Sequence, residues 1–143
     1  MTLFIVPGFR QKISDPVWQQ VKSLAENFFA KVVMFQPDWN YNTLADWVKE
    51  FDLLRQKHTG PQIVLGFSFG AMIAYVSSSM MNTKAAVLCS LSPYFAEELP
   101  KIKSWWKQKV GQKRIQVFQK LKFGQLAKAN QTKTYLLVGE KES

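Results

Sequence analysis

The stretch that most constrains the fold runs from Pro61 to Ala74, where a short apolar segment leads through Gly66-Phe67-Ser68-Phe69-Gly70 into a second apolar segment. Residues 63–65 are branched and apolar and follow Gly60-Pro61, a pattern typical of a buried strand. No glycine or proline follows Gly70 for more than two helical turns, which predicts a helix. We therefore expect Ser68 at a sharp turn between a strand and a helix.

The two glycines around Ser68 have a physical reason at such a turn. A serine there adopts a strained backbone conformation that exposes its hydroxyl, and side chains two residues before and after it would collide with neighbouring backbone. The N–H groups at the start of the helix point toward the same place, where they can stabilise a negative tetrahedral intermediate. The pattern predicts a nucleophilic serine; the alternative interpretation is a plain glycine-rich turn.

The rest of the chain alternates between apolar strands and amphipathic helices. Strands are expected at about 2–6, 31–36, 84–90 and 134–138, and helices at about 15–30, 43–58 and 70–80. Continuous apolar strands that alternate with helices predict an α/β fold with a mostly parallel sheet, right-handed crossovers and helices on both faces. Residues 93–132 are predicted to insert two or three amphipathic helices, interrupted near Gly111. Without a repeat or linker, residues 1–143 are expected to form a single domain.

Composition excludes several classes of protein. With 143 residues, 47% of them hydrophobic, the chain is long enough to bury a core. Cys89 is the single cysteine, so no disulfide forms within the chain and a reducing compartment is favoured. The N-terminal apolar run is too short for a signal peptide, and no run approaches the roughly 18 apolar residues of a membrane span. We expect a cytoplasmic protein with no cofactor and no metal.

The net charge of +9 comes from one basic segment, residues 101–133, which contains no acidic residue. Its basic residues are Lys101, Lys103, Lys107, Lys109, Lys113, Arg114, Lys120, Lys122, Lys128 and Lys133. They are interpreted either as a solvated face or as a surface for an anionic ligand or an acidic carrier protein. The charge would suit nucleic acid, but no nucleic-acid-binding motif is present, so that partner is not expected.

Together with the loop Val6-Pro7-Gly8-Phe9-Arg10, the turn at Ser68 resembles the α/β-hydrolase superfamily, in the compact form of a serine esterase or acyl hydrolase. The resemblance spans nearly the whole sequence. It implies that Ser68 is the nucleophile and that the backbone N–H groups of Phe9 and Phe69 hold the oxyanion. Proline stands at position 7, where a histidine is usual in this family.

The same resemblance implies a catalytic carboxylate after the last strand. Gly139-Glu140-Lys141-Glu142 is similar to the family's acid loop, with glutamate in place of the usual aspartate. Glu142 is predicted to orient a histidine, and Glu140 is the rival. The alternative interpretation is a solvated acidic loop.

The histidine that this mechanism needs is not evident in the sequence. His58, the single histidine, is expected at a helix end, at the edge of the sheet opposite Ser68, and it precedes the serine, whereas the family's order is serine, acid, histidine. We interpret His58 as a surface residue. The chain is therefore predicted to be C-terminally incomplete; the alternative is a hydrolase-like fold without a working triad.

The helical insertion stands where α/β-hydrolases commonly carry a cap over the site. Trp105, Trp106 and Phe118 are candidates to line an acyl pocket, unless these aromatic side chains pack on the sheet. The expected function is hydrolysis of a carboxylic ester or thioester of a small acyl substrate through an acyl-enzyme on Ser68. The alternative is a catalytically inactive module that binds a ligand or an acidic partner through its basic helices.

Overall fold

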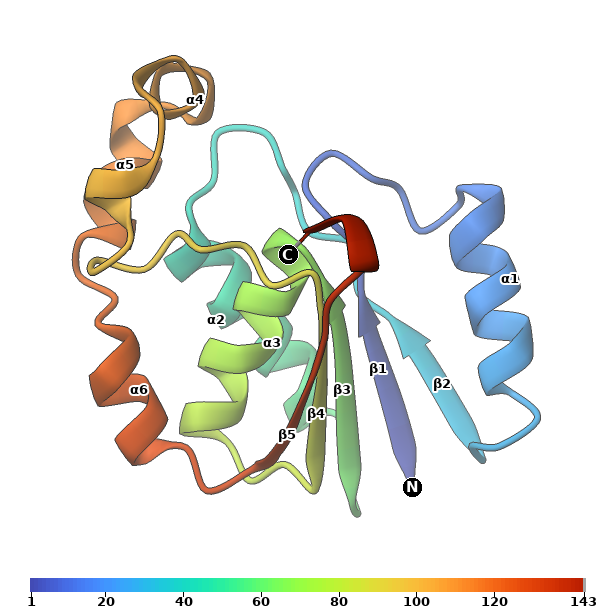
Figure 1. Cartoon of the computed structure of the whole chain (residues 1–143). Helices are drawn as coiled ribbons and strands as arrows, with labels where there is room; N and C mark the ends of the chain where they lie inside the picture. The colour runs from blue at the N-terminus through green and yellow to red at the C-terminus, as the bar shows by residue number, and fades with distance from the viewer. Residues whose placement is uncertain (143) are drawn as a thin grey trace.

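A single parallel sheet forms the centre of the computed structural model, which describes residues 1–142; Ser143 and the side chain of Glu142 lie outside this description. The strands are β1 (Thr2–Val6), β2 (Lys31–Met34), β3 (Gln62–Phe67), β4 (Ala85–Cys89) and β5 (Lys133–Leu137). Their order in the sheet is β2-β1-β3-β4-β5, and every neighbouring pair is parallel (Figure 1). The predicted α/β fold with a mostly parallel sheet is confirmed.

Helices cover both faces of this sheet, as predicted. The three that connect the first four strands are α1 (Pro16–Ala25), α2 (Leu44–Gln56) and α3 (Phe69–Met80). Helix α1 lies on one face, and α2 and α3 lie on the other (Figure 1). No helix within residues 1–142 is both long enough and apolar enough to cross a lipid bilayer.

Side chains of β1 alternate between two hydrophobic cores, one on each face of the sheet. Leu3 and Ile5 pack with Trp18 of α1. Phe4 and Val6 point to the opposite face and belong to the larger core beneath α2 and α3. Because both faces of β1 are covered, its five residues are all buried and read as a continuous apolar run.

Helix α1 is shorter than the pattern predicts, and its buried side includes Trp18 together with Val21 and Ala25. It ends at Ala25 and not near residue 30, because the amides of Asn27 and Phe28 bond to carbonyls three residues back and tighten the chain into a turn. Trp18 is buried, whereas its apolar neighbour Val17 is 56% exposed. The two residues are about 100° apart around the helix, so the larger indole takes the core position.

A capping box of Thr43 and Asp46 stands at the start of α2. The backbone N–H of Thr43 donates to Oδ2 of Asp46 at 2.8 Å, and the Thr43 hydroxyl donates to the same oxygen at 3.0 Å. These hydrogen bonds to the charged carboxylate lower the pKa of Asp46. The box fixes where the helix begins, directly after the loop that follows β2.

The insertion between β4 and β5 is helical, as predicted. It contains η1 (Leu99–Lys101), α4 (Ser104–Val110), α5 (Gln112–Phe118) and α6 (Phe123–Ala129). The expected interruption near Gly111 is confirmed: this glycine has φ 99° and separates α4 from α5. Helices α5 and α6 lie beside α2 and α3, on the same side of the sheet (Figure 1).

A buried arginine ties α2 to the amino ends of β3 and β4. Arg55 has no exposed surface. Its guanidinium donates to Oε1 of Gln62 at 2.9 Å, to Oγ of Ser77 at 2.6 Å and to Oγ1 of Thr83 at 2.7 Å. Ser77 in turn donates to the carboxylate of Asp52. Burial of the guanidinium lowers its pKa and makes these partners necessary.

We expect Arg55→Ala to lower the free energy of unfolding by about 3–5 kcal/mol, since it leaves several buried polar groups unpaired. Urea denaturation followed by circular dichroism measures the change. The matched control is Lys57→Ala, an exposed residue two positions on, which should stay within about 0.5 kcal/mol of the parent. Equal effects of the two substitutions would contradict a structural role for the Arg55 network.

Candidate active site

The candidate site lies at the carboxyl ends of β1 and β3. Strand β2 is on one side of β1 and β3 is on the other, so the order of the sheet reverses between β1 and β3. The connections that leave these two strands diverge to opposite sides of the sheet and open a crevice, the usual place for ligands in α/β sheets. The loop after β1 brings Phe9 to this crevice, and the turn after β3 brings Ser68.

Ser68 occupies a strained turn between β3 and α3. Its φ is 56° and its ψ is −117°, a conformation that costs a residue other than glycine about 1–3 kcal/mol. Two backbone hydrogen bonds hold it: the Ser68 N–H donates to the Cys89 carbonyl at 2.9 Å, and the Ser68 carbonyl accepts from Ala71 N–H at 3.0 Å. The strand-to-helix turn expected from the sequence is therefore present.

The glycines on either side of Ser68 are required by close packing. A Cβ on Gly66 would lie 2.3 Å from the carbonyl oxygen of Gly70. A Cβ on Gly70 would lie 2.3 Å from the carbonyl oxygens of both Val6 and Pro7. No side chain fits at such distances, so helix α3 can approach β1 and β3 this closely only with glycine at both positions.

Phe9 and Phe69, whose backbone N–H groups are the predicted oxyanion donors, both lie at this end of the sheet. Phe69 is the first residue of α3, where an N–H has no acceptor within the helix. Phe9 lies in a turn closed by two bonds between Gly8 and Gln11, of 3.0 Å and 2.7 Å. Within residues 1–142, neither the Phe9 nor the Phe69 amide donates a hydrogen bond. Their rings are in contact, with centroids 5.1 Å apart.

Ser92 is a site residue that the sequence did not single out. Its Oγ lies 2.9 Å from Oγ of Ser68, and its side chain is buried. Ser92 belongs to the loop after β4, the strand beside β3. The available signal was its position: a polar side chain shortly after the carboxyl end of a strand adjacent to the strand that carries Ser68.

His58 lies at the other end of the sheet, as expected. It follows the end of α2, its carbonyl accepts a hydrogen bond from Nε2 of Gln62 at 2.9 Å, and its ring packs on Phe4. Gln62 begins β3 and Ser68 follows its end, so six residues of strand, about 20 Å, separate them. Burial, followed by the nearby Lys31 and Lys57, lowers the pKa of His58. His58 is therefore too far away to exchange a proton with Ser68.

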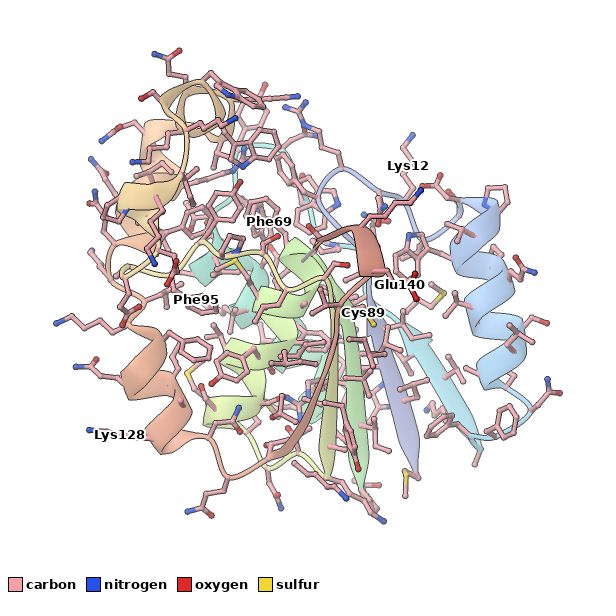
Figure 2. The ribbon with its side chains drawn as sticks, in the orientation of Figure 1. Lys12, Phe69, Cys89, Phe95, Lys128 and Glu140 are labelled. Carbon is pink, nitrogen blue, oxygen red and sulfur yellow. The ribbon has the colours of Figure 1, made fainter. Side chains whose placement is uncertain are left out.

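The predicted acid loop follows β5 as η2 (Glu140–Glu142), at the same end of the sheet as Ser68 (Figure 1). Figure 2 shows Glu140 and Cys89 at this end, and Phe69 at the start of α3. The Glu142 side chain lies outside the described residues. The choice of Glu142 over Glu140 as the acid stays a prediction.

The three aromatic residues proposed for an acyl pocket do not share one surface. Trp105 is 61% exposed, and Phe118 has no exposed surface. Trp106 packs against Tyr94, with their ring centroids 6.4 Å apart. Phe118 stacks on Phe69 with ring centroids 5.8 Å apart, inside the larger core. Phe118 could meet a substrate only if the helical segment moved; the pocket role of the two tryptophans stays a prediction.

Two other titratable groups near the crevice remain protonated at neutral pH. Burial raises the pKa of Tyr94 to about 12 and also raises the pKa of Cys89. A thiol that holds its proton is a weak nucleophile, so Cys89 does not compete with Ser68 for this role. Among the described residues, no group of three or more His, Cys, Asp or Glu side chains is placed to hold a metal ion.

We expect Gly66→Ala and Gly70→Ala each to lower the free energy of unfolding by about 2–4 kcal/mol, because each added methyl overlaps backbone atoms. Gly124→Ala is the matched control: a Cβ there has no atom within 4 Å. Thermal and urea denaturation of the three variants measure the difference. Parent-like stability of Gly70→Ala would show that α3 does not approach β1 as closely as described.

Comparison with solved structures relates this arrangement to known folds at low sequence identity. Est1E from Butyrivibrio proteoclasticus superposes with a TM-score of 0.73 at 14% identity, over 98% of this chain and 67% of that one. Alpha/beta hydrolase domain-containing protein 10 from mouse superposes with a TM-score of 0.71 at 10% identity, over 97% of this chain and 80% of that one. The ydeN gene product of B. subtilis superposes with a TM-score of 0.58 at 15% identity, over 95% of this chain and 84% of that one. These likenesses show an α/β-hydrolase fold.

Sequence comparison supplies the family. No curated protein sequence gives a significant match to this chain. The family model described as serine hydrolase matches residues 3–121, which include β1, the turn at Ser68 and the loop that carries Ser92. That match covers well over half of the sequence. The chain therefore belongs to the serine hydrolase family.

Proposed function

We propose that this protein hydrolyses carboxylic esters or thioesters of small acyl substrates through an acyl-enzyme on Ser68. One observation carries the proposal: a serine in a strained strand-to-helix turn, with two backbone amides beside it that lack partners within residues 1–142. Membership of the serine hydrolase family supports hydrolysis in general. The ester or thioester bond is the finer part of the proposal.

The proposed chemistry follows from the positions of these groups. Oγ of Ser68 attacks the carbonyl carbon, and the carbonyl electron pair moves to the oxygen, which becomes an oxyanion. The N–H groups of Phe9 and Phe69 donate to that oxyanion. Its collapse breaks the bond to the alcohol or thiol, which leaves with a proton, and water then attacks the acyl-enzyme to release the acid.

Ser68 needs an acceptor for its proton before it can attack. The hydroxyl of Ser92 accepts or donates a hydrogen bond at 2.9 Å, but a neutral hydroxyl is too weak a base to hold the proton. His58 is at the opposite end of β3 and cannot reach it. We propose that an imidazole oriented by a carboxylate of the acid loop takes the proton, as the family resemblance implies, and no described residue supplies that imidazole.

A second candidate function is ligand binding without hydrolysis. The observation that favours it is the distance of about 20 Å between His58 and Ser68, estimated from six residues of β3. In that case the crevice and the basic helices would bind a ligand or an acidic partner, and Ser68 would remain unacylated. Labelling with a fluorophosphonate, which reacts only with an activated serine, separates the two candidates.

We expect Ser68→Ala to reduce hydrolysis of short p-nitrophenyl esters to the uncatalysed rate and to abolish fluorophosphonate labelling, since the attacking oxygen is removed. Rates are measured with and without added imidazole, and the Ser68→Ala rate is subtracted to remove imidazole's own reaction with the ester. Ser23→Ala, an exposed serine on α1, is the control and should match the parent. Undiminished activity in Ser68→Ala would refute the nucleophile; no labelling of the parent protein would favour the binding function.

We expect Ser92→Ala to lower kcat about fivefold, because loss of a hydrogen bond of about 1 kcal/mol frees the Ser68 hydroxyl to leave its attacking position. Steady-state kinetics with the same esters measure it. The control is Ser79→Ala on α3, whose hydroxyl bonds only to the Val76 carbonyl. Equal kcat values for parent and Ser92→Ala would show that Ser92 does not position Ser68.

A further inference from the structure

A cleft that takes no part in the proposed chemistry lies next to the loop that carries Phe9. It is a cleft of about 520 Å³ between the loop after β2 and the beginning of α5. Arg10, Lys113, Arg114, Trp39 and Tyr41 help to line it, with amide side chains between them and no acidic residue in its lining. Its volume is in the range of small-molecule sites.

Three cations line this cleft, and none of them forms an ion pair within residues 1–142, although the charge of Lys113 lowers the pKa of Asp46 outside the lining. Arg10 and Lys113 are exposed, and neither forms an ion pair or hydrogen bond among residues 1–142. Arg114 is held in place by its own donors, which bond to the backbone carbonyls of Trp39, Asn42 and Val110. An anion in the cleft would therefore meet a fixed guanidinium and two cations free to move toward it.

Two of these cations lie over the ring of Phe9. The guanidinium carbons of Arg10 and Arg114 are 5.1 Å and 5.2 Å from the centroid of the Phe9 ring. Burial, and then the charge of Arg10, lowers the pKa of Arg114. A bound anion replaces this repulsion between like charges with attraction to both.

Two residues of the cleft lining have strained backbone conformations. Arg10 has φ 63° and Tyr41 has φ 64°, conformations that glycine adopts freely and other residues adopt at about 1–3 kcal/mol. The Arg10 conformation is fixed by the turn in which Gln11 N–H bonds to the Gly8 carbonyl at 3.0 Å. Both strained residues belong to the lining of the cleft, and Tyr41 is 93% exposed.

Phe9 connects the cleft to the candidate site in sequence and in packing. Arg10 follows Phe9, whose N–H is a proposed oxyanion donor, and consecutive Cα atoms are about 3.8 Å apart. The Phe9 ring contacts both Phe69 and Trp39, at 5.1 Å and 5.4 Å between centroids. A small molecule whose carbonyl lies at Phe9 would therefore have Arg10 and Arg114, the two cations beside the Phe9 ring, near its other end.

We propose that this cleft binds a negatively charged group, a carboxylate or a phosphate, carried by the small ester substrate. The position of the ester rests on the proposed function; the binding of the anion does not. A concave site beside Phe9 favours a small anion over an acidic protein, because only Lys113 and Arg114 of the basic segment reach it, while other basic residues, such as Lys128 on the outer side of α6, lie elsewhere (Figure 2).

The binding test uses the full chain carrying Ser68→Ala, so that catalysis plays no part. Isothermal titration calorimetry with glutarate and with inorganic phosphate should show one site, weakened about tenfold by Arg10→Gln and by Lys113→Gln. Lys128→Gln removes the same charge away from the cleft and should leave the affinity unchanged. A tighter Kd for glutarate or for phosphate identifies which anion the cleft prefers.

The kinetic test uses two matched esters, p-nitrophenyl valerate and the mono-p-nitrophenyl ester of glutaric acid. The anionic ester should have the lower KM by about tenfold, and Arg10→Gln should remove this difference. The proposal would be overturned if the three variants, Arg10→Gln, Lys113→Gln and Lys128→Gln, all bound a given anion with the same affinity. It would also be overturned if the protein bound poly-glutamate tightly but bound neither glutarate nor phosphate. If no ester is hydrolysed but calorimetry shows the expected pattern, the proposed function fails and the anion site stands.

Discussion

The close approach of α3 to the ends of β1 and β3 is the constraint on which the rest of the structure depends. It exists because Gly66 and Gly70 carry no side chain where a Cβ would lie 2.3 Å from neighbouring carbonyl oxygens. This contact compresses the connection between β3 and α3 into a single strained residue, Ser68. It also brings the start of α3 next to the loop after β1, so that the rings of Phe9 and Phe69 are in contact.

Features that depend on a few consecutive residues could be predicted from the sequence. The turn at Ser68, the box between Thr43 and Asp46 and the break at Gly111 are each written in a pattern shorter than ten residues. The burial of Trp18 in α1 could not be predicted in the same way, since Trp18 and Val17 both suit a core and only packing on Leu3 and Ile5 decides between them. Ser92 was missed because its partner is 24 residues away in sequence and becomes adjacent only through the pairing of β3 with β4.

The helical insertion shows why an aromatic pattern alone does not define a pocket. Phe118 has the spacing of a residue on the apolar face of a helix, and that face can equally line a cavity or pack on the protein. In the structure Phe118 packs on Phe69 together with Tyr94, whose ring stacks on Phe69 at 4.9 Å. The insertion is therefore joined to the residue that follows Ser68, so that a displacement of α5 would be transmitted to the turn at the site.

The distribution of strain explains how the fold separates stability from function. All four residues other than glycine with positive φ within residues 1–142, namely Arg10, Tyr41, Ser68 and Ser90, follow the carboxyl ends of β1 to β4. At the amino ends of the same sheet, Arg55 is buried with its hydrogen bonds satisfied by α3, β3 and the turn before β4. Strained conformations persist only where the surrounding structure over-determines them. The two packed cores and the Arg55 network make the sheet rigid. This rigidity allows Ser68 and Arg10, at the carboxyl ends of the strands, to keep backbone conformations that an unsupported loop would not keep.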